Sequence, residues 1–404
     1  MRIAIIGGGI GGLTAALALR QFGFEPTIFE QAPELLEVGS AILTWPNAMR
    51  VLHRLGLAEH IREHGAVLEK SQWRSRDGKL LNQFWFPRTD FPAVAVHRAE
   101  LQQTLVHALP QDSIHLGHAF ESYEQLPNQI IAHFSNASSF ECDVLIGADG
   151  LHSHTRAQLL NDGPPAEHGY VAWRGVATQH IESIAPDTAT EIYGRGQRFG
   201  IGPMGAGKIG WWASVNKSLL DEKHLDGADA SVTHSMTPED HASIRAELLR
   251  LFDGWSAPVP DLIRATPLTA LVKNRVCDRR PVGKWGEGCL TLIGDAIHPV
   301  TPNLGQGGCL AIEDAAVLAR CLEKYASNGS ANETAAPLAL RRFEALRYSR
   351  TAWVARCSRA YGIVGQWENG AGSLRDLILP MVPGRIAARA LRSIFNYDAY
   401  AIRI

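Results

Sequence analysis

Residues 2–30 read RIAIIGGGIGGLTAALALRQFGFEPTIFE, and this stretch decides the fold. The apolar, β-branched run 2–6 is typical of a strand buried on both faces of a parallel sheet. A glycine-rich turn follows at once, and the Ala, Leu, Gln and Arg residues of 13–22 favour a helix. Residues 24–30 read as a second strand that ends on an acid. The stretch therefore predicts a strand–turn–helix–strand unit.

The glycines of this turn stand at the spacing of a dinucleotide fingerprint. Gly7 allows a tight turn, Gly9 lets a pyrophosphate approach the backbone, and Gly12 lets the helix pack against the strand. The helix N-terminus then offers its N–H groups and positive dipole end to phosphates. Glu30 is placed to accept hydrogen bonds from a ribose. A secretion signal or an ordinary βα turn would explain the stretch less well, because no small-residue cleavage pattern follows and later motifs agree.

Composition sets broad limits. The 404 residues suggest two or three domains, and 46% hydrophobic with 20% charged residues is typical of a globular protein. A formal charge of −2 gives no basic footprint, so no nucleic-acid partner is expected. No apolar run approaches the roughly 20 residues of a transmembrane segment. The six cysteines form no CxxC pair, which favours a reduced, cytoplasmic setting. No HExxH motif suggests a metal site, so none is expected.

The remaining elements are expected as follows. Short strands should form a small meander at 113–116, 120–126, 129–135 and from 140. Alternating or aromatic stretches predict antiparallel strands at 72–76 and 80–86, around the turn Asp77-Gly78, and at 170–177, 190–193, 197–203 and 208–215. Helices are expected at 48–55, 99–109, 241–252, 310–324 and 337–359, with shorter ones within 374–395. Loops are expected at 219–240 and 326–336.

Two acidic turns each follow a buried strand. The first contains Asp149-Gly150, and the second runs from Gly294-Asp295 to the glycines of 305–308. In an open parallel sheet, ligands bind beyond the carboxyl ends of strands, where these turns and the first glycine turn would converge. Asp295 would suit a polyol chain, and the 305–308 turn offers a second set of backbone N–H groups.

Together these residues resemble the p-hydroxybenzoate-hydroxylase-like, or group A, FAD-dependent monooxygenases. The glycine fingerprint, Arg98, Asp149-Gly150 and Gly294-Asp295 stand in that family's order over residues 1–175 and 280–350. The resemblance implies a set of cofactor-binding residues: Gly7, Gly9, Gly11, Gly12, Glu30, Gln31, Ala41, Arg98, Asp149, Asp295, Pro302, Gly305, Gln306, Gly307 and Gly308. Asp149 is linked in this family to flavin and NAD(P)H, but a helix cap after the strand is the alternative.

The resemblance also implies a fold and a reaction. The fold is α/β, with a discontinuous Rossmann-like FAD-binding domain (1–71, 97–170 and 280–345) that has a parallel sheet and a β-meander. A smaller antiparallel-sheet substrate domain (72–96 and 171–279) and a C-terminal helical segment (346–404) complete it. Tight, non-covalent FAD would be reduced by NADH or NADPH, which docks without a second glycine fingerprint. Oxygen would then give a flavin C4a-hydroperoxide that hydroxylates an aromatic or N-heteroaromatic small molecule.

Within the class, the motifs are most similar to those of the urate-hydroxylase and zeaxanthin-epoxidase branch. Arg198 fits that branch's substrate-activating arginine and is the one catalytic candidate, although an exposed strand arginine would explain it equally well. Gly210 stands where the urate enzymes carry a tyrosine, which favours an apolar or aromatic substrate over urate. Trp173, Trp211 and Trp212 are candidates for the pocket wall, but they could also be plain core.

Other functions stay open. An isoprenoid epoxidase and a non-catalytic flavin-binding redox sensor are the alternatives, whereas the WxWxIP signature of flavin halogenases is absent. The apolar face of 377–395 could cover the active site, form a homodimer contact or touch a membrane.

Overall fold

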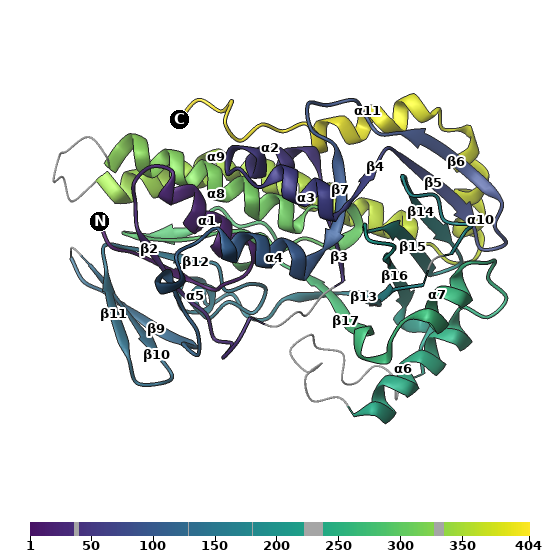
Figure 1. Cartoon of the computed structure of the whole chain (residues 1–404), viewed down its shortest axis with the longest axis horizontal. Coiled ribbons are helices and arrows are strands. Elements are labelled where there is room, and N and C mark those ends of the chain that lie inside the picture. Colours follow the sequence, from purple (N-terminus) through teal and green to yellow (C-terminus); the bar gives the residue numbers. More distant parts are fainter. Residues whose placement is uncertain (36–39, 128, 180, 222–236, 327–334) are drawn as a thin grey trace.

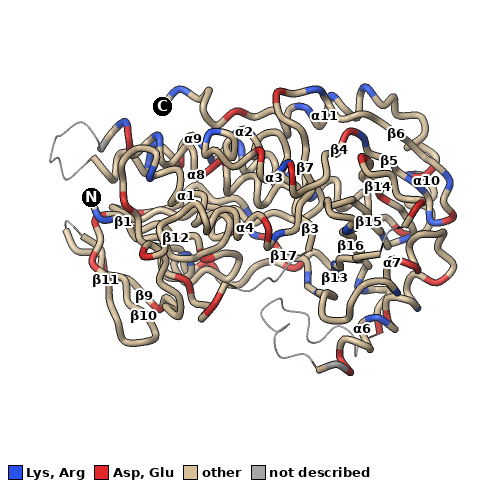
Figure 2. The backbone as a smooth tube through the Cα atoms, viewed as in Figure 1, with Lys and Arg blue, Asp and Glu red and all other residues tan. Residues whose placement is uncertain are grey.

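The computed structural model describes residues 1–35, 40–127, 129–179, 181–221, 237–326 and 335–404. It has two lobes, one around a parallel sheet and one around an antiparallel sheet, and two long helices, α8 (Gly307–Ala326) and α9 (Ala335–Gly365), span much of its length (Figure 1). Acidic and basic residues are mixed along both lobes (Figure 2).

The first lobe is built on a six-stranded sheet whose central strand is β1 (Ile3–Ile6). β1 lies parallel to β2 (Pro26–Phe29) on one side and to β12 (Val144–Gly147) on the other. The outer strands are β8 (Ile114–His115), β19 (Leu290–Leu292) and the antiparallel β18 (Gly286–Glu287). The expected first unit is confirmed, with its helix α1 (Ile10–Arg20) starting earlier than expected, at Ile10 within the glycine-rich stretch.

One expected meander strand was assigned to the wrong sheet. β8 pairs in parallel with β2, because Ile114 meets Ile28 at the edge of the main core. The meander itself consists of β9 (Phe120–Gln125), β10 (Ile130–Phe134) and β11 (Ser139–Cys142). Its apolar face covers Ala4, Ile6 and Phe29 of the parallel sheet.

Helices cover the other face of this sheet, where α1 packs on α8 and α8 packs on α9. The other helices of this lobe are α2 (Pro46–Arg54), α3 (Ala58–His64), α4 (Arg98–His107) and α5 (His154–Leu160). A small sheet of β3 (Ala41–Thr44), β7 (Ala93–His97) and β4 (Ala66–Leu68) lies between these helices and the second lobe. No helix in the described ranges is long and apolar enough to cross a bilayer.

The second lobe is a seven-stranded sheet in which all neighbours are antiparallel except β5 and β14. In spatial order its strands are β17 (Val272–Asp278), β13 (Ala166–Ala177), β16 (Ile209–Asn216), β15 (Gln197–Pro203), β14 (Thr188–Tyr193), β5 (Lys70–Ser75) and β6 (Leu80–Trp85). The hairpin between β5 and β6 turns at Gly78, whose φ of +88° suits the expected turn.

Two helices cover one face of this sheet. α6 (Pro238–Leu251) was expected, whereas α7 (Val259–Ala265) was not, because two prolines within its first residues disguise it. The C-terminal helices are α10 (Asn369–Ile378) and α11 (Gly384–Phe395). Most of the loops expected at 219–240 and 326–336 lies outside the described residues.

Candidate functional site

The glycine turn packs so tightly that only one of its fingerprint positions has free space. A Cβ on Gly7 would lie 2.5 Å from the carbonyl oxygen of Ala148, and Gly7 has a φ of +109°. A Cβ on Gly12 would lie 2.0 Å from the carbonyl oxygen of Gly7. A Cβ on Gly9, by contrast, would meet nothing within 4 Å, and no side chain caps α1 there. The space beside Gly9 and the uncapped N–H groups fit a pyrophosphate.

Glu30 is held next to this turn. Its carboxylate accepts hydrogen bonds from the backbone N–H of Gly8 at 2.7 Å and of Ala32 at 2.9 Å. Each carboxylate oxygen has a second lone pair, so Glu30 can also accept a ribose hydroxyl. Gln31 is exposed beside it.

The two acidic turns and the glycine turn meet, as expected. Cβ atoms built on Gly11 and Gly294 would lie 3.2 and 3.0 Å from the same Cβ, that of Ala311 in α8. A Cβ on Gly307 would lie 3.7 Å from Oδ1 of Asp295. The carboxyl ends of β1 and β19 and the start of α8 therefore face one region.

Asp295 contributes a negative charge to this region. Its side chain is exposed although its neighbours Gly294 and Ala296 are buried. Desolvation by the surrounding protein raises the pKa of the Asp295 carboxyl, and the charges of His298 and Arg98 work against that rise. Arg98 begins α4 and is itself exposed. The two exposed, opposite charges fit the polyol and phosphate groups of a dinucleotide.

Sequence reasoning missed Arg174, the third charge of this region. Burial is the largest influence on its guanidinium and lowers its pKa, Arg98 lowers it further, and Asp295 raises it. Arg174 could have been found in the sequence as a basic residue in an otherwise apolar stretch of β13.

Asp149 has the geometry of the alternative role, a helix cap. One carboxylate oxygen accepts from the Ser153 hydroxyl at 2.6 Å, and the other accepts from the backbone N–H and the hydroxyl of Thr155, both at 3.0 Å. These bonds organise the start of α5. The buried Arg156 of α5 in turn donates to the carbonyl of Ile297 at 2.7 Å, which connects this cap to the Asp295 turn.

The 302–308 turn presents backbone to the site rather than the Gln306 side chain. Gly305 has a φ of +60°, and a Cβ on Gly308 would lie 3.0 Å from Ile42 of β3, next to Ala41. Pro302 is exposed. The Gln306 amide, in contrast, is fully buried and accepts a hydrogen bond from Asn47 at 3.0 Å. The Gln306 side chain is therefore held in the protein interior against α2.

Arg198 is buried, so the alternative of an exposed strand arginine is wrong. It is 1% exposed and donates to Glu191 at 3.0 Å, to Gln366 at 2.9 Å and to Asn303 at 2.5 Å. Its guanidinium carbon lies 5.1 Å from the centre of the Trp212 ring. Through Asn303, Arg198 is connected directly to the 302–308 turn.

Trp173 and Trp211 do not wall a pocket on this side of the sheet, which corrects that expectation. Both rings are buried among the side chains of α6 and α7, on the opposite face. Trp211 stacks on Phe199 at 5.2 Å, and its indole N–H donates to Thr266 at 2.7 Å. Strand alternation explains the difference, because Trp212 follows Trp211 and therefore points to the Arg198 face.

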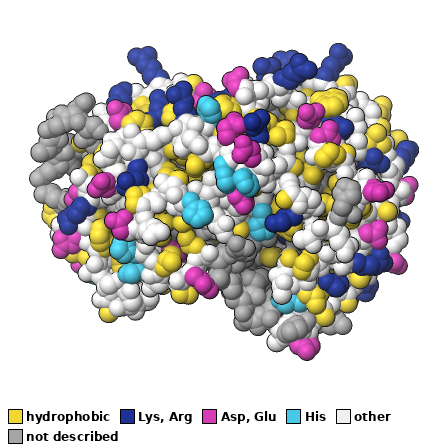
Figure 3. Space-filling view, viewed as in Figure 1, with side chains coloured by type: hydrophobic (Ala, Val, Ile, Leu, Met, Phe, Trp, Pro, Cys, Tyr) yellow, Lys and Arg dark blue, Asp and Glu magenta, His cyan; other side chains and the backbone are white. Residues whose placement is uncertain are grey.

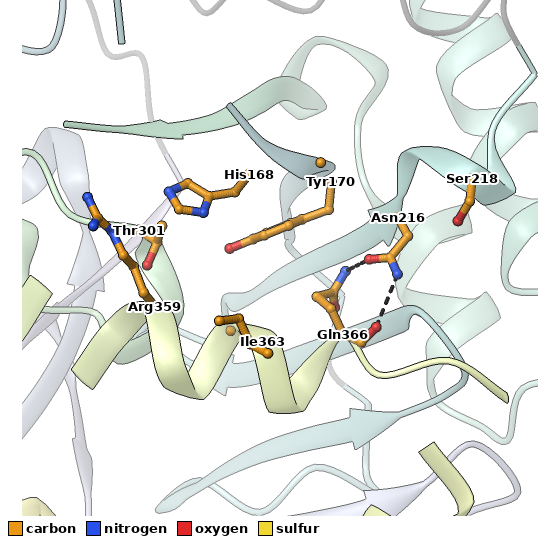
Figure 4. A pocket seen from close by; sticks show the side chains of 10 residues that line it. His168, Tyr170, Asn216, Ser218, Thr301, Arg359, Ile363 and Gln366 are labelled. Carbon is orange, nitrogen blue, oxygen red and sulfur yellow. Dashed lines mark hydrogen bonds between the residues drawn. The ribbon is translucent and has the colours of Figure 1, made fainter. Parts of the chain in front are cut away.

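A cavity of about 280 Å³ adjoins the Arg198 network. Figure 4 shows Tyr170 pointing across it toward α9, with Asn216 and Gln366 hydrogen-bonded at one end and His168 near Arg359 at the other. The Tyr170 hydroxyl accepts a hydrogen bond from the Asn303 amide at 3.1 Å. The cavity therefore borders the 302–308 turn, because Thr301 lines it and Asn303 of the turn contacts Tyr170.

The chain is similar to known proteins in sequence and in fold. Residues 1–336 match the family described as FAD binding domain. The chain belongs to the group A FAD-dependent monooxygenases. It is 36% identical to aurachin C monooxygenase/isomerase of Stigmatella aurantiaca over 98% of both chains. It is 33% identical to the FAD-dependent urate hydroxylase of Klebsiella pneumoniae subsp. pneumoniae, over 87% of this chain and 86% of that one.

The fold comparison agrees with the sequence comparison. The structure of Klebsiella pneumoniae HpxO complexed with FAD and uric acid superposes with a TM-score of 0.85, at 29% identity, over 98% of this chain and 97% of that one. The protein is therefore an FAD-dependent monooxygenase of the aromatic hydroxylase type, and the family resemblance, the fold class and the enzyme class expected from the sequence are confirmed.

Proposed function

We propose that this monooxygenase uses NADH or NADPH and O₂ to hydroxylate a neutral, flat aromatic or N-heteroaromatic molecule. Bound FAD supplies the redox chemistry, and the chain supplies binding, orientation and exclusion of water. The region beside Gly9 would take the pyrophosphate, and Glu30 the ribose. Arg98 and Asp295 would hold the ribityl side, and the backbone of 302–308 the edge of the flavin ring.

The ion pair between Arg198 and Glu191 carries the proposal of a neutral substrate. Both side chains are well shielded, with exposures of 1% and 12%, and their charges cancel at 3.0 Å. The Tyr361 hydroxyl donates to the other Glu191 oxygen at 2.5 Å, which fixes the carboxylate. An anionic substrate would find no uncompensated charge on Arg198, whereas the neighbouring Trp212 ring suits stacking.

The space around Gly210 supports a substrate other than urate. A Cβ on Gly210 would lie 2.5 Å from the sulfur of Met204 and 2.6 Å from the Cβ of Ala41. Apolar side chains thus fill the position where a tyrosine of the urate enzymes is expected. Relatives of similar identity include 6-hydroxynicotinate 3-monooxygenase of Pseudomonas fluorescens, 31% identical over 88% of this chain and 90% of that one. Its named substrate supports a heteroaromatic ring, but it carries a carboxylate, so the neutral substrate rests on the Arg198–Glu191 pair alone.

The proposal is tested by anaerobic reduction. The FAD-loaded protein is mixed with NADH or NADPH and with matched pairs of ligands, such as a hydroxypyridine and the corresponding pyridine carboxylate. We expect bleaching of the flavin absorbance to accelerate with neutral rings. Acceleration by carboxylates alone would contradict the neutral substrate. Absence of bleaching with any ligand would favour the redox sensor.

Glu191→Gln sharpens the test, because it removes the negative charge and keeps the shape. The variant should bind aromatic carboxylates at least about tenfold more tightly than the parent protein, because the positive charge of Arg198 is then no longer neutralised by Glu191. Flavin spectral titration measures this affinity.

Arg198→Ala should retain FAD but lose substrate-stimulated oxidation of NAD(P)H. Unchanged turnover in Arg198→Ala would remove its catalytic assignment.

An isoprenoid epoxidase is the second candidate. The chain is 31% identical to the chloroplastic zeaxanthin epoxidase of Oryza sativa subsp. japonica over 96% of its own length, but it spans only 60% of that protein. Product analysis separates the two, because an epoxidase adds oxygen to an alkene and a hydroxylase to a ring.

A homodimer through the exposed side chains of Leu377, Met381 and Ile386 is a further proposal, which sedimentation would test.

A further inference from the structure

The surface of α3 and α4 carries a cluster of metal-ligating side chains that are not among the residues assigned to the flavin. His60 and His64 lie one turn apart on α3, and Glu100 lies in the first turn of α4. One ligand atom from each of the three lies within 4.8 Å of the other two. Histidine side chains gather over this part of the surface in Figure 3. The sequence predicted no metal site, because this HxxxH pair takes its third member from another helix.

One of the two histidines, His64, is already oriented by a backbone hydrogen bond. The Nδ1 of His64 lies 2.9 Å from the carbonyl oxygen of His60, so it donates its proton there and leaves Nε2 with a lone pair. Such a backbone bond is the usual way in which a metal-binding histidine is fixed. The two rings stack with centroids 4.0 Å apart and planes at 23°, so the two imidazoles lie directly against each other.

Glu100 completes the set on the same side. Its Oε1 lies 3.0 Å from Nε2 of His60, and the two side chains are 33% and 46% exposed. Metal–nitrogen and metal–oxygen bonds of about 2.0–2.2 Å in a tetrahedral zinc site put neighbouring ligand atoms about 3.3 Å apart. The observed separations reach that geometry through side-chain rotations alone, which an exposed surface permits. Two imidazoles and a carboxylate suit Zn²⁺ or Ni²⁺ better than Mg²⁺, which prefers oxygen ligands.

We propose that His60, His64 and Glu100 form a surface site for a divalent transition metal ion, with water as the fourth ligand. The ion would connect α3 to the first turn of α4, two residues beyond Arg98. This connection makes the site structural or regulatory. It is independent of the assignment of the flavin-binding residues.

Calorimetric titration of the FAD-loaded protein with zinc chloride tests the proposal. We expect one ion per chain at micromolar affinity, with magnesium chloride giving no heat of binding. His64→Ala should weaken zinc binding by at least about tenfold, and Glu100→Gln should weaken it less. His107→Ala is the matched control, because it removes an exposed histidine from α4 outside the cluster.

Thermal unfolding provides the second readout. Zinc should raise the Tm of the parent protein and of His107→Ala, because an ion that binds only the folded state stabilises it. It should leave the Tm of His64→Ala unchanged. Both variants should melt like the parent without metal, since the altered side chains are exposed. Equal zinc affinity in His64→Ala and the parent would overturn the site, as would a parent that takes up no zinc.

Discussion

The phosphate-binding end of the molecule and the Arg198 face of the second lobe are organised in different ways. At the first, backbone N–H groups and glycines within six residues of sequence form the site. At the second, Arg198 is held by Glu191, Asn303 and Gln366, which are 7, 105 and 168 residues away. A site made of local backbone can be recognised in a sequence, whereas one made of distant side chains needs the fold.

A third region, between α8 and α9, shows how far a network of distant side chains extends into the core. Arg347 is fully buried and lies 2.7 Å from Glu313 and 2.6 Å from Asp314. Asp314 also accepts the backbone N–H of Gly294 at 2.9 Å and meets His298 at 2.5 Å. The buried ion pairs therefore position Asp314, which contacts Gly294 and His298 on either side of Asp295.

Replacing Arg347 should produce the largest effect. Arg347→Met leaves two buried carboxylates without their shared cation, so we expect a loss of about 3–5 kcal/mol in the free energy of unfolding. Thermal and urea unfolding measure it. Arg356→Met is the control, because Arg356 is exposed on the same helix and should cost less than about 0.5 kcal/mol. Similar losses in both variants would mean that helix α9, and not the charge network, determines the change.

Two alanine substitutions in the glycine turn should have different effects on stability and on FAD binding. Gly12→Ala places a methyl group against the Gly7 carbonyl, so it should destabilise even the FAD-free protein, by about 1–3 kcal/mol. Gly9→Ala meets no protein atom and should leave the Tm of the FAD-free protein unchanged, while FAD binding weakens at least about tenfold. Titration of FAD into each apoprotein distinguishes the two. If Gly9→Ala bound FAD normally, the pyrophosphate would lie elsewhere.

The same contrast explains what the sequence could and could not predict. Strand β1, the turn and α1 follow from composition and glycine spacing, and the convergence of the three turns follows from the geometry of parallel sheets. The face on which each tryptophan lies did not follow, because Trp211 and Trp212 are both aromatic and the strand register decides which is core. The burial of Arg198 depends on Asn303 and Gln366, 105 and 168 residues away, which no local pattern reveals. The cap formed by Asp149 uses the nearby Ser153 and Thr155 and was foreseen as the alternative.

Asp278 connects the antiparallel sheet to α9 and should give a pH signature. Burial raises the pKa of its carboxyl, but hydrogen bonds from His168 and Arg359 outweigh burial and leave the pKa below its usual range. A lowered pKa stabilises the fold above the unfolded value of about 3.9, and this stabilisation is lost as pH falls through the folded pKa. Asp278→Asn should therefore cost about 1–2 kcal/mol at pH 7 and progressively less below pH 4.

Tm measured from pH 7 to pH 3 provides the check for Asp278→Asn. Asp112→Asn, at an exposed carboxylate, is the control and should give a difference that stays near zero. A difference between the Asp278 variant and the parent that does not shrink on acidification would rule out the charged hydrogen bonds as its source.

The smallest effects should come from two tryptophans on opposite faces of one sheet. Trp173→Phe trims a fully buried ring among α6 and α7, so it should lower stability by about 1 kcal/mol and leave kcat and KM unchanged. Trp212→Phe keeps an aromatic ring under Arg198 at a half-buried position, so it should change stability by less than about 0.5 kcal/mol but raise the KM for the aromatic substrate. Steady-state kinetics and thermal unfolding of both variants decide the matter. A KM change in Trp173→Phe would mean that the sheet face covered by α6 and α7 also affects substrate binding. The assignment of one face to structure and the other to substrate would then be wrong.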